Sequence, residues 1–202
     1  MSEDLLTIRN KVSIFLLFAA FLSAMMGLVF VDVVWMSDEL HEASFTEITQ
    51  ELLLAVIAAL FIYHARKSPE QRPIRILVAG FFCCMLIREL DFLFDKISHG
   101  SWFWFALAVA GVSMIAALRH PRFLVSGLAD FMRHPAWGMM TAGMLTILVF
   151  SRLFGMNELW QHLMPGDYHR TVKNMAEEGS ELLGYTLCLF ATLGYLMPSK
   201  KK

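Results

Sequence analysis

The sequence predicts an all-α integral membrane protein in which six transmembrane helices form one bundle and both termini lie in the cytoplasm. Three observations lead to this prediction. Hydrophobic residues make up 57% of the 202 residues and charged residues only 17%, against about 45–50% and about 25% in soluble domains. The apolar residues gather in long runs. Lys and Arg concentrate in alternate connections between those runs.

Six apolar runs approach the ~20 residues that a helix needs to cross the hydrocarbon core of a bilayer. Each should be helical, because lipid offers the backbone no other hydrogen-bond partner. The first run is longer than the ~7–15-residue core of a signal peptide, so we expect it to be retained. No linker divides the chain, and a single transmembrane domain over 1–202 is expected. Its helices are predicted at 12–35, 45–65, 74–95, 102–118, 135–154 and 174–196.

The distribution of basic residues sets the expected orientation. Connections 64–75 and 119–134 are rich in Lys and Arg and the chain ends in three Lys, whereas 35–44 and 96–101 hold only Lys96. Because Lys and Arg favour the cytoplasmic side, the termini are placed inside, in a plasma membrane or bacterial inner membrane. The fifth connection departs mildly from this alternation. Trp rings favour the two interfaces, with Trp35, Trp102, Trp104 and Trp160 expected outside and Trp137 inside.

Local signals refine the helix boundaries. Ser44 and Glu47 have the spacing of a capping box, and Asn174 and Glu177 repeat that spacing with Asn as the N-cap. Residues 122–132 and 155–164 are expected to form short helices at the inner and outer surfaces. Ser180 and Gly184 form a small-xxx-small pair that would let another helix approach closely.

Acidic side chains inside three of the runs lie at similar depth from the outer surface. With a rise of ~1.5 Å per residue, Glu51 lies roughly 9 Å inside its run, and the groups of the third and sixth runs lie roughly 6–11 Å inside theirs. The candidate metal ligands are Glu51, Glu89, Asp91, Glu178 and Glu181, supported by Gln50, Arg88, Tyr185 and His99. Five carboxylates thus face one internal cation, Arg88. An ionised group at this depth costs at least ~2.5–3.5 kcal/mol, so a proton, water or a bound cation has to compensate the excess.

This excess predicts a cavity, open to the outer side, that binds a cation. A divalent metal is the expected ion, held for transport across the membrane or for use within it. Three other interpretations stay open: a proton relay, a metal-dependent membrane enzyme acting on a lipid or small substrate, and a sensor or accessory subunit in which the charges form only a structural network. The sequence has no Glu-x-x-His, His-Glu-x-x-His or Gly-x-Ser-x-Gly motif, so it identifies neither a metal nor a reaction.

The expected partners are the lipid bilayer and, to complete a transport pathway, a second copy of the chain. A net charge of −1 and the lack of a basic face with interleaved aromatics give no reason to expect nucleic acid. Cys83, Cys84 and Cys188 have no metal-site or disulfide spacing and are expected to be small apolar core residues. Asp32 and Asp95 lie near the interfaces, where we expect them to be solvated.

Overall fold

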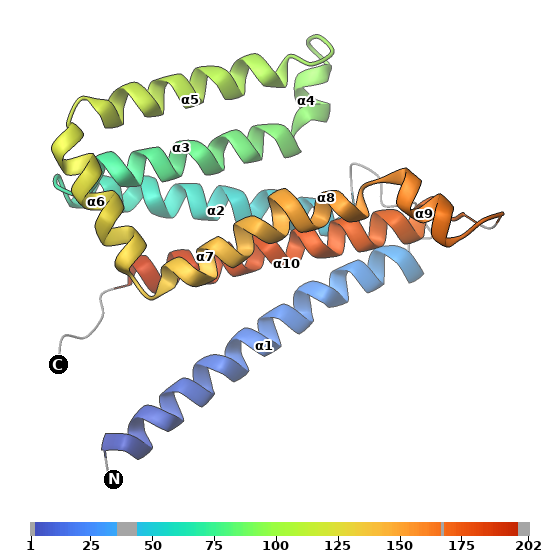
Figure 1. The fold of residues 1–202 in the computed structure, drawn as a ribbon, viewed down its shortest axis with the longest axis horizontal. Coiled ribbons are helices and arrows are strands. Elements are labelled where there is room, and N and C mark those ends of the chain that lie inside the picture. The colour runs from blue at the N-terminus through green and yellow to red at the C-terminus, as the bar shows by residue number, and fades with distance from the viewer. Residues whose placement is uncertain (1–2, 36–43, 167, 198–202) are drawn as a thin grey trace.

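The computed structural model describes residues 3–35, 44–166 and 168–197, and every regular element in these ranges is a helix (Figure 1). The predicted all-α class is therefore confirmed. Three helical stretches are long and apolar enough to cross a membrane: Glu3–Val34, Phe45–Lys67 and Ala136–Phe154. The pair α5 (Trp102–Leu118) and α6 (Pro121–Arg133), bent by 103°, would add a fourth if it counts as one span.

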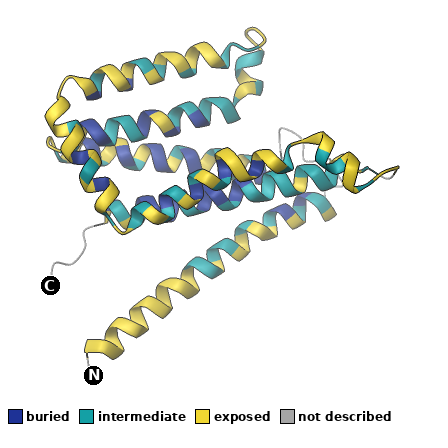
Figure 2. Cartoon of the chain, in the orientation of Figure 1, coloured by how far each residue is buried: buried dark blue, intermediate teal, exposed yellow. Residues whose placement is uncertain are grey.

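The bundle is built around α10 (Arg170–Leu196), which packs against both α2 (Phe45–Lys67) and α7 (Ala136–Leu145). Helix α3 (Arg72–Glu89) lies between α2 and α5. Tyr185 and Cys188 of α10 are fully buried with Phe61 of α2 and Phe82 of α3 in one hydrophobic core. Burial accordingly concentrates on α10, α2 and α3, while α5 exposes most of its surface (Figure 2).

Short helices close the two ends of the bundle (Figure 1). We call the α6 end the one where α2 and α5 finish and α3 begins. The α9 end is the one where α2 and α10 begin, α3 finishes, and α4 (Asp91–Asp95), α8 (Ser151–Phe154) and α9 (Asn157–Leu163) lie. Helices α6 and α9 occupy the positions at which the sequence predicts short surface helices.

Helix α1 (Glu3–Trp35) meets the bundle along its C-terminal half and diverges from it toward the N-terminus (Figures 1 and 2). Phe18 stacks on Phe190 of α10 with ring centroids 3.8 Å apart. Asp32, expected to be solvated, is only 2% exposed. Its carboxylate accepts hydrogen bonds from the backbone N–H groups of Phe45 and Thr46, at 3.1 and 2.8 Å. The expectation was wrong because Asp32 caps the first turn of α2, which supplies the partners that water would otherwise supply.

The capping box predicted at the start of α2 is supported at its N-cap, where Ser44 Oγ accepts a hydrogen bond from the Glu47 N–H at 3.1 Å. The cap predicted at Asn174 is wrong: α10 begins at Arg170 with His169 as its N-cap, and Asn174 lies within the helix. The ion pair between Lys173 and Glu177, at 3.1 Å, has the i, i+4 spacing that stabilises a helix. It supports the additional turn of α10 that precedes Asn174.

The helix predicted over 74–95 is broken. Helix α3 ends at Glu89, Leu90 has φ −86° and ψ 20°, and α4 begins at Asp91. This break turns the chain toward α5 at the α9 end. It therefore separates Asp91 from the helical face that carries Arg88.

A glycine contact brings α10 and α7 together. A Cβ atom on Gly184 would overlap the side chain of Ile147 and lie 2.9 Å from the carbonyl oxygen of Gly143. A Cβ atom on Gly143 would in turn lie 2.8 Å from the carbonyl oxygen of Gly184. The close approach expected at Gly184 is thus present, with α7 as the partner helix.

We predict that Gly184→Ala lowers the melting temperature of the protein, because the added methyl group has no room and overpacking costs about 1–3 kcal/mol. Gly179 of the same helix is the matched control, since a Cβ there meets nothing within 4 Å. Gly179→Ala should leave the melting temperature unchanged or raise it, because Ala favours a helix interior by about 0.5–1 kcal/mol. Thermal unfolding in detergent, followed by circular dichroism, measures both. Equal melting temperatures would show that the crossing is not tightly packed.

Candidate functional site

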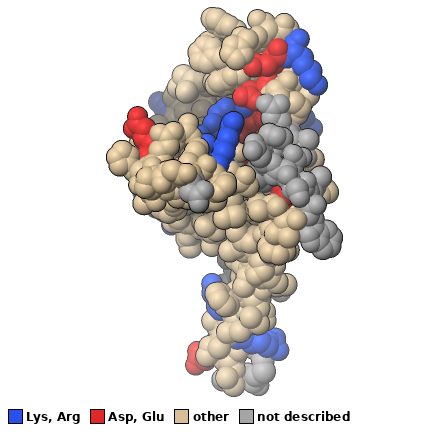
Figure 3. Space-filling model, turned by 90° about the vertical axis from the view of Figure 1, so that its right-hand side faces the viewer, with Lys and Arg blue, Asp and Glu red and all other residues tan. Residues whose placement is uncertain are grey.

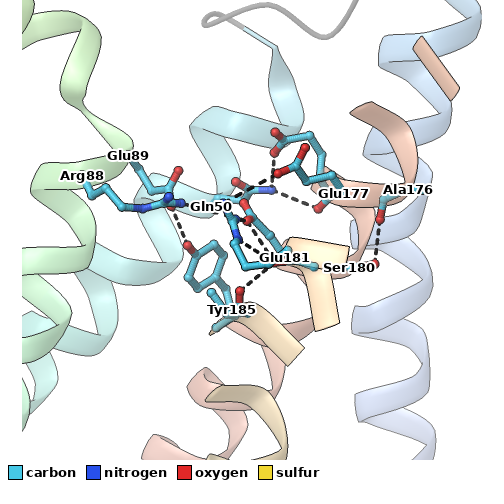
Figure 4. Close-up of polar contacts among 12 residues, drawn as sticks. Gln50, Arg88, Glu89, Ala176, Glu177, Ser180, Glu181 and Tyr185 are labelled. Carbon is cyan, nitrogen blue, oxygen red and sulfur yellow. Dashed lines mark hydrogen bonds and ion pairs between the residues drawn. The ribbon is translucent and has the colours of Figure 1, made fainter. Parts of the chain in front are cut away.

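Polar side chains from α2, α3, α8 and α10 converge at the α9 end, where Figure 4 shows them pointing toward one another. We call this group the polar cluster. Its members are Gln50, Arg88, Glu89, Ser151, Arg152, Lys173, Glu177, Glu178, Glu181 and Tyr185. Basic and acidic atoms lie next to each other on this face of the molecule (Figure 3).

Glu181 is the most deeply placed carboxylate of the cluster, with 3% of its side chain exposed. Its Oε1 forms a close ion pair with Nη2 of Arg152 and accepts a hydrogen bond from Ser151 Oγ at 3.2 Å. Arg88 Nη2 lies 4.0 Å from the same oxygen. A buried charge is stable only with such partners, so this carboxylate joins α10 to α8 and, more weakly, to α3.

Glu89 is held from two sides. Arg88 Nη2 lies 2.6 Å from its Oε1, and the hydroxyl of Tyr185 donates a hydrogen bond to the same atom at 2.7 Å. Tyr185 is fully buried, so its hydroxyl needs an acceptor inside the bundle. The pair therefore connects the end of α3 to the centre of α10.

Glu177 binds two cations, Lys173 at 3.1 Å and Arg152 at 3.7 Å. It therefore acts as an ion-pair partner between α8 and α10, in place of the capping role that the sequence predicts. Arg152 thus bridges two carboxylates of α10, one turn apart.

Gln50 and Glu178 form the part of the cluster whose hydrogen-bonding capacity is not filled. Gln50 is fully buried, and its Nε2 donates to the Glu178 side chain at 2.9 Å and to the Glu178 carbonyl oxygen at 3.1 Å. Gln50 Oε1 is buried without a hydrogen-bond partner among the described residues. Within the same residues, Glu178 has no cation within ion-pair distance. An amide oxygen without a described partner therefore lies beside a carboxylate that no described cation contacts.

The charge balance of the cluster differs from that expected. Arg88 is the one internal cation expected from the sequence, but Arg152 and Lys173 also bind carboxylates of the cluster. In the part of the chain that the structure describes, four carboxylates of the cluster face three cations. The uncompensated charge is therefore that of Glu178.

The structure brings some predicted site residues to the cluster and leaves others outside. Glu51 is half-buried one position beyond Gln50, within electrostatic range of Glu89. Asp91 is exposed as the first residue of α4, and the break at Leu90 is the reason. The His99 side chain is 99% exposed and bonds to Asp95 at 2.9 Å. Asp91 and His99 therefore do not join the contacts of the cluster among the described residues.

Arg152 is a cluster residue that the sequence did not predict, because its position near the end of the predicted helix 135–154 groups it with the charges of the fifth connection. A π-helical segment, η1 (Thr146–Phe150), lies directly before it, and the Ser151 N–H donates to the Thr146 carbonyl oxygen five residues earlier. A π turn holds one residue more than an α turn, so the residues that follow are rotated by about 100° relative to an uninterrupted α-helix. Ser151 and Arg152 thereby contact α10.

The predicted metal is not visible as a ready-made ligand set. Across 3–35, 44–166 and 168–197, no three His, Cys, Asp or Glu side chains are grouped so that they could hold one metal ion. Cys83, Cys84 and Cys188 are free thiols, and Cys188 is buried against Gly143. The divalent metal stays a prediction.

Comparison of the chain with protein-family models, with curated proteins and with solved structures gave no match.

We predict that Arg152→Gln lowers the melting temperature, since it leaves Glu181 buried with Ser151 and the distant Arg88; the loss of such a partner costs about 1–3 kcal/mol, and more for a charged group. Arg88→Gln should cost less, because Glu89 keeps its hydrogen bond from Tyr185. Arg133 is the control: its ion pair with Asp130 is exposed, and such pairs contribute about 0–1 kcal/mol. Melting of the three variants in detergent decides the order. An Arg152 variant as stable as the Arg133 variant would contradict the role given to Glu181.

Proposed function

We propose that the chain is an integral plasma-membrane protein with six crossings, with the α6 end facing the cytoplasm and the α9 end facing outward. Three helical stretches are long and apolar enough to cross on their own. Helices α3 and α10 carry more charge, but contacts within the bundle neutralise much of it, as Arg88 does for Glu89. Charged groups that pair inside a bundle are compatible with membrane depth. Helix α5, which is almost wholly apolar, supplies the remaining crossing.

The proposed orientation predicts that α5 separates two accessible positions. Ser98 is exposed at the α9 end and Ser126 is exposed on α6. A membrane-impermeant maleimide should label Ser98→Cys on intact cells, and should label Ser126→Cys only after permeabilisation. The wild-type chain, whose Cys residues are buried or half-buried, gives the background. The reverse pattern would invert the topology, and labelling of both from one side would show that α5 does not cross.

The function that the geometry supports best is the binding of a cation at the polar cluster, for transport across the membrane or for use within it. Gln50 Oε1 carries this proposal, because it is a buried acceptor without a described partner beside a carboxylate without a described cation. A buried acceptor left unpaired costs about 1–3 kcal/mol. A cation bound between Gln50 and Glu178 would supply the missing positive charge to both groups.

The number of charges bears on the class of cation. The contacts of the cluster leave the single negative charge of Glu178, which a monovalent cation or a cationic substrate group would balance. Glu51, half-buried and close enough to Glu89 to interact with it, adds a second negative charge at the same end. The divalent metal expected from the sequence would match this larger set and would use oxygen ligands, which Ca²⁺ and Mg²⁺ prefer.

We predict that one cation among Na⁺, K⁺, Mg²⁺, Ca²⁺, Mn²⁺ and Zn²⁺ raises the melting temperature of the purified protein in a concentration-dependent way, because a ligand that binds only the folded state stabilises it by mass action. Glu178→Gln should abolish the shift. Glu158, exposed on α9, is the control: Glu158→Gln removes the same charge from the same end and should retain the shift.

Elemental analysis of the purified wild-type protein accompanies the melting experiment. A metal that copurifies in stoichiometric amount and is absent from Glu178→Gln would favour the divalent class. If no cation shifts the melting temperature and none copurifies, the cluster is a structural network and the cation proposal is wrong.

A further inference from the structure

A groove lies at the surface of the bundle between α2, α3 and α5, and none of its lining residues belongs to the polar cluster. Its volume is about 460 Å³, within the range of ~300–1,000 Å³ typical of ligand sites. Small and aliphatic side chains line most of it, including Ile76, Ala79, Ala108 and Val112. Two arginines, Arg66 at the end of α2 and Arg72 at the start of α3, line it at the α6 end.

The tight contact of α3 with α5 shapes this groove. Gly80 and Ser113 both line it, and a Cβ atom on Gly80 would overlap the Ser113 side chain. Because the two helices touch at this point, a bound molecule must lie along the contact and cannot pass between the helices.

The length of the groove matches one leaflet of a bilayer. It extends along α3 from Arg72 to Cys83, which at ~1.5 Å per residue is roughly 16 Å. The hydrocarbon core of a bilayer is ~30 Å thick, so the groove reaches from one surface to about the midplane. Its charged end lies at the surface and its apolar part lies at the depth of acyl chains.

The two arginines are available to bind a ligand. Both side chains are exposed, and neither has an ion-pair partner among the described residues. The neighbouring Arg75 differs, because its Nη1 donates to the His64 carbonyl oxygen at 2.8 Å. The groove therefore combines an apolar channel with two guanidinium groups that no described carboxylate neutralises.

We propose that this groove binds an anionic phospholipid of the leaflet at the α6 end, with an acyl chain along α3 and the phosphate between Arg66 and Arg72. Guanidinium groups bind phosphate oxygens through paired, charge-assisted hydrogen bonds. The inference uses the membrane placement proposed above but not the cation site, so a Glu178→Gln variant should bind the lipid normally.

The test is native mass spectrometry of the full-length protein, released from detergent after titration with phosphatidylglycerol or with phosphatidylcholine of the same acyl chains. The wild-type protein should retain phosphatidylglycerol at lower lipid concentration than phosphatidylcholine. Arg66→Gln combined with Arg72→Gln should weaken phosphatidylglycerol binding by about tenfold or more, given the usual contribution of a basic side chain at an anionic surface. Ala108→Trp, which fills the groove from an exposed position on α5, should weaken binding of the acyl chain.

Two matched variants separate a defined site from general attraction. Arg119→Gln combined with Arg122→Gln removes the same charge at the same end, and Met114→Trp adds the same ring to an exposed position of α5 outside the groove. Both should bind phosphatidylglycerol like the wild type, and all variants compared should melt like it. Equal retention of the two lipids, an equal loss in the Arg119/Arg122 variant, or unchanged binding in Ala108→Trp would each overturn the proposal.

Discussion

The ion pair between Glu181 and Arg152 is the interaction on which the packing of the α9 end depends. Glu181 is 3% exposed, and a carboxylate so placed must be neutralised by its neighbours or the bundle opens to admit water. Three helices meet this requirement together. The π turn of η1 directs Ser151 and Arg152 of α8 at α10, and Arg88 approaches from the end of α3. Because Arg152 also reaches Glu177 and Arg88 also holds Glu89, the neutralisation of one buried charge fixes the positions of several others.

Different interactions dominate in the middle and at the two ends of the same helices. Toward the middle, α10 meets α7 through Gly143 and Gly184 and buries Tyr185 and Cys188, so packing dominates. At the α9 end the same helix carries carboxylates that need cations from other helices. At the α6 end, arginines such as Arg66 and Arg72 remain exposed without described acidic partners. Lys and Arg of membrane proteins favour the cytoplasmic side, so this asymmetry connects the proposed orientation to the proposed lipid groove.

Elements that depend on local composition could be predicted from the sequence, and those that depend on tertiary pairing could not. The apolar runs located α2, α5 and the helix over Ala136–Phe154, because hydrophobicity over ~20 residues is a local property. Asp32 was expected to be solvated, since its role as a cap for α2 exists only when two distant segments meet. Arg152 was grouped with the charges of the fifth connection, because the 3.6-residue period does not reveal the π turn that directs it at α10. The break at Leu90 likewise could not be predicted, so Asp91 was expected in a site to which the structure does not bring it. His99, which is exposed and paired with Asp95, is not brought there either.

The pattern of pairing separates two kinds of carboxylate on one helix. Glu181 and Glu177 form ion pairs with described cations, and the pairs with Arg152 connect α8 to α10. Among the described residues, the Glu178 carboxylate has no ion pair and accepts a hydrogen bond from the amide of Gln50, whose oxygen has no described partner. A side chain binds a ligand most tightly when its neighbours already hold it in the binding geometry, because binding then costs little conformational entropy. The paired carboxylates provide that rigid frame, and Glu178 is the one carboxylate of the frame with capacity left for a ligand. Of the charge excess expected from the sequence, the cluster leaves Glu178 without a described cation, with the half-buried Glu51 at the same end. The proposed cation binds beside Glu178.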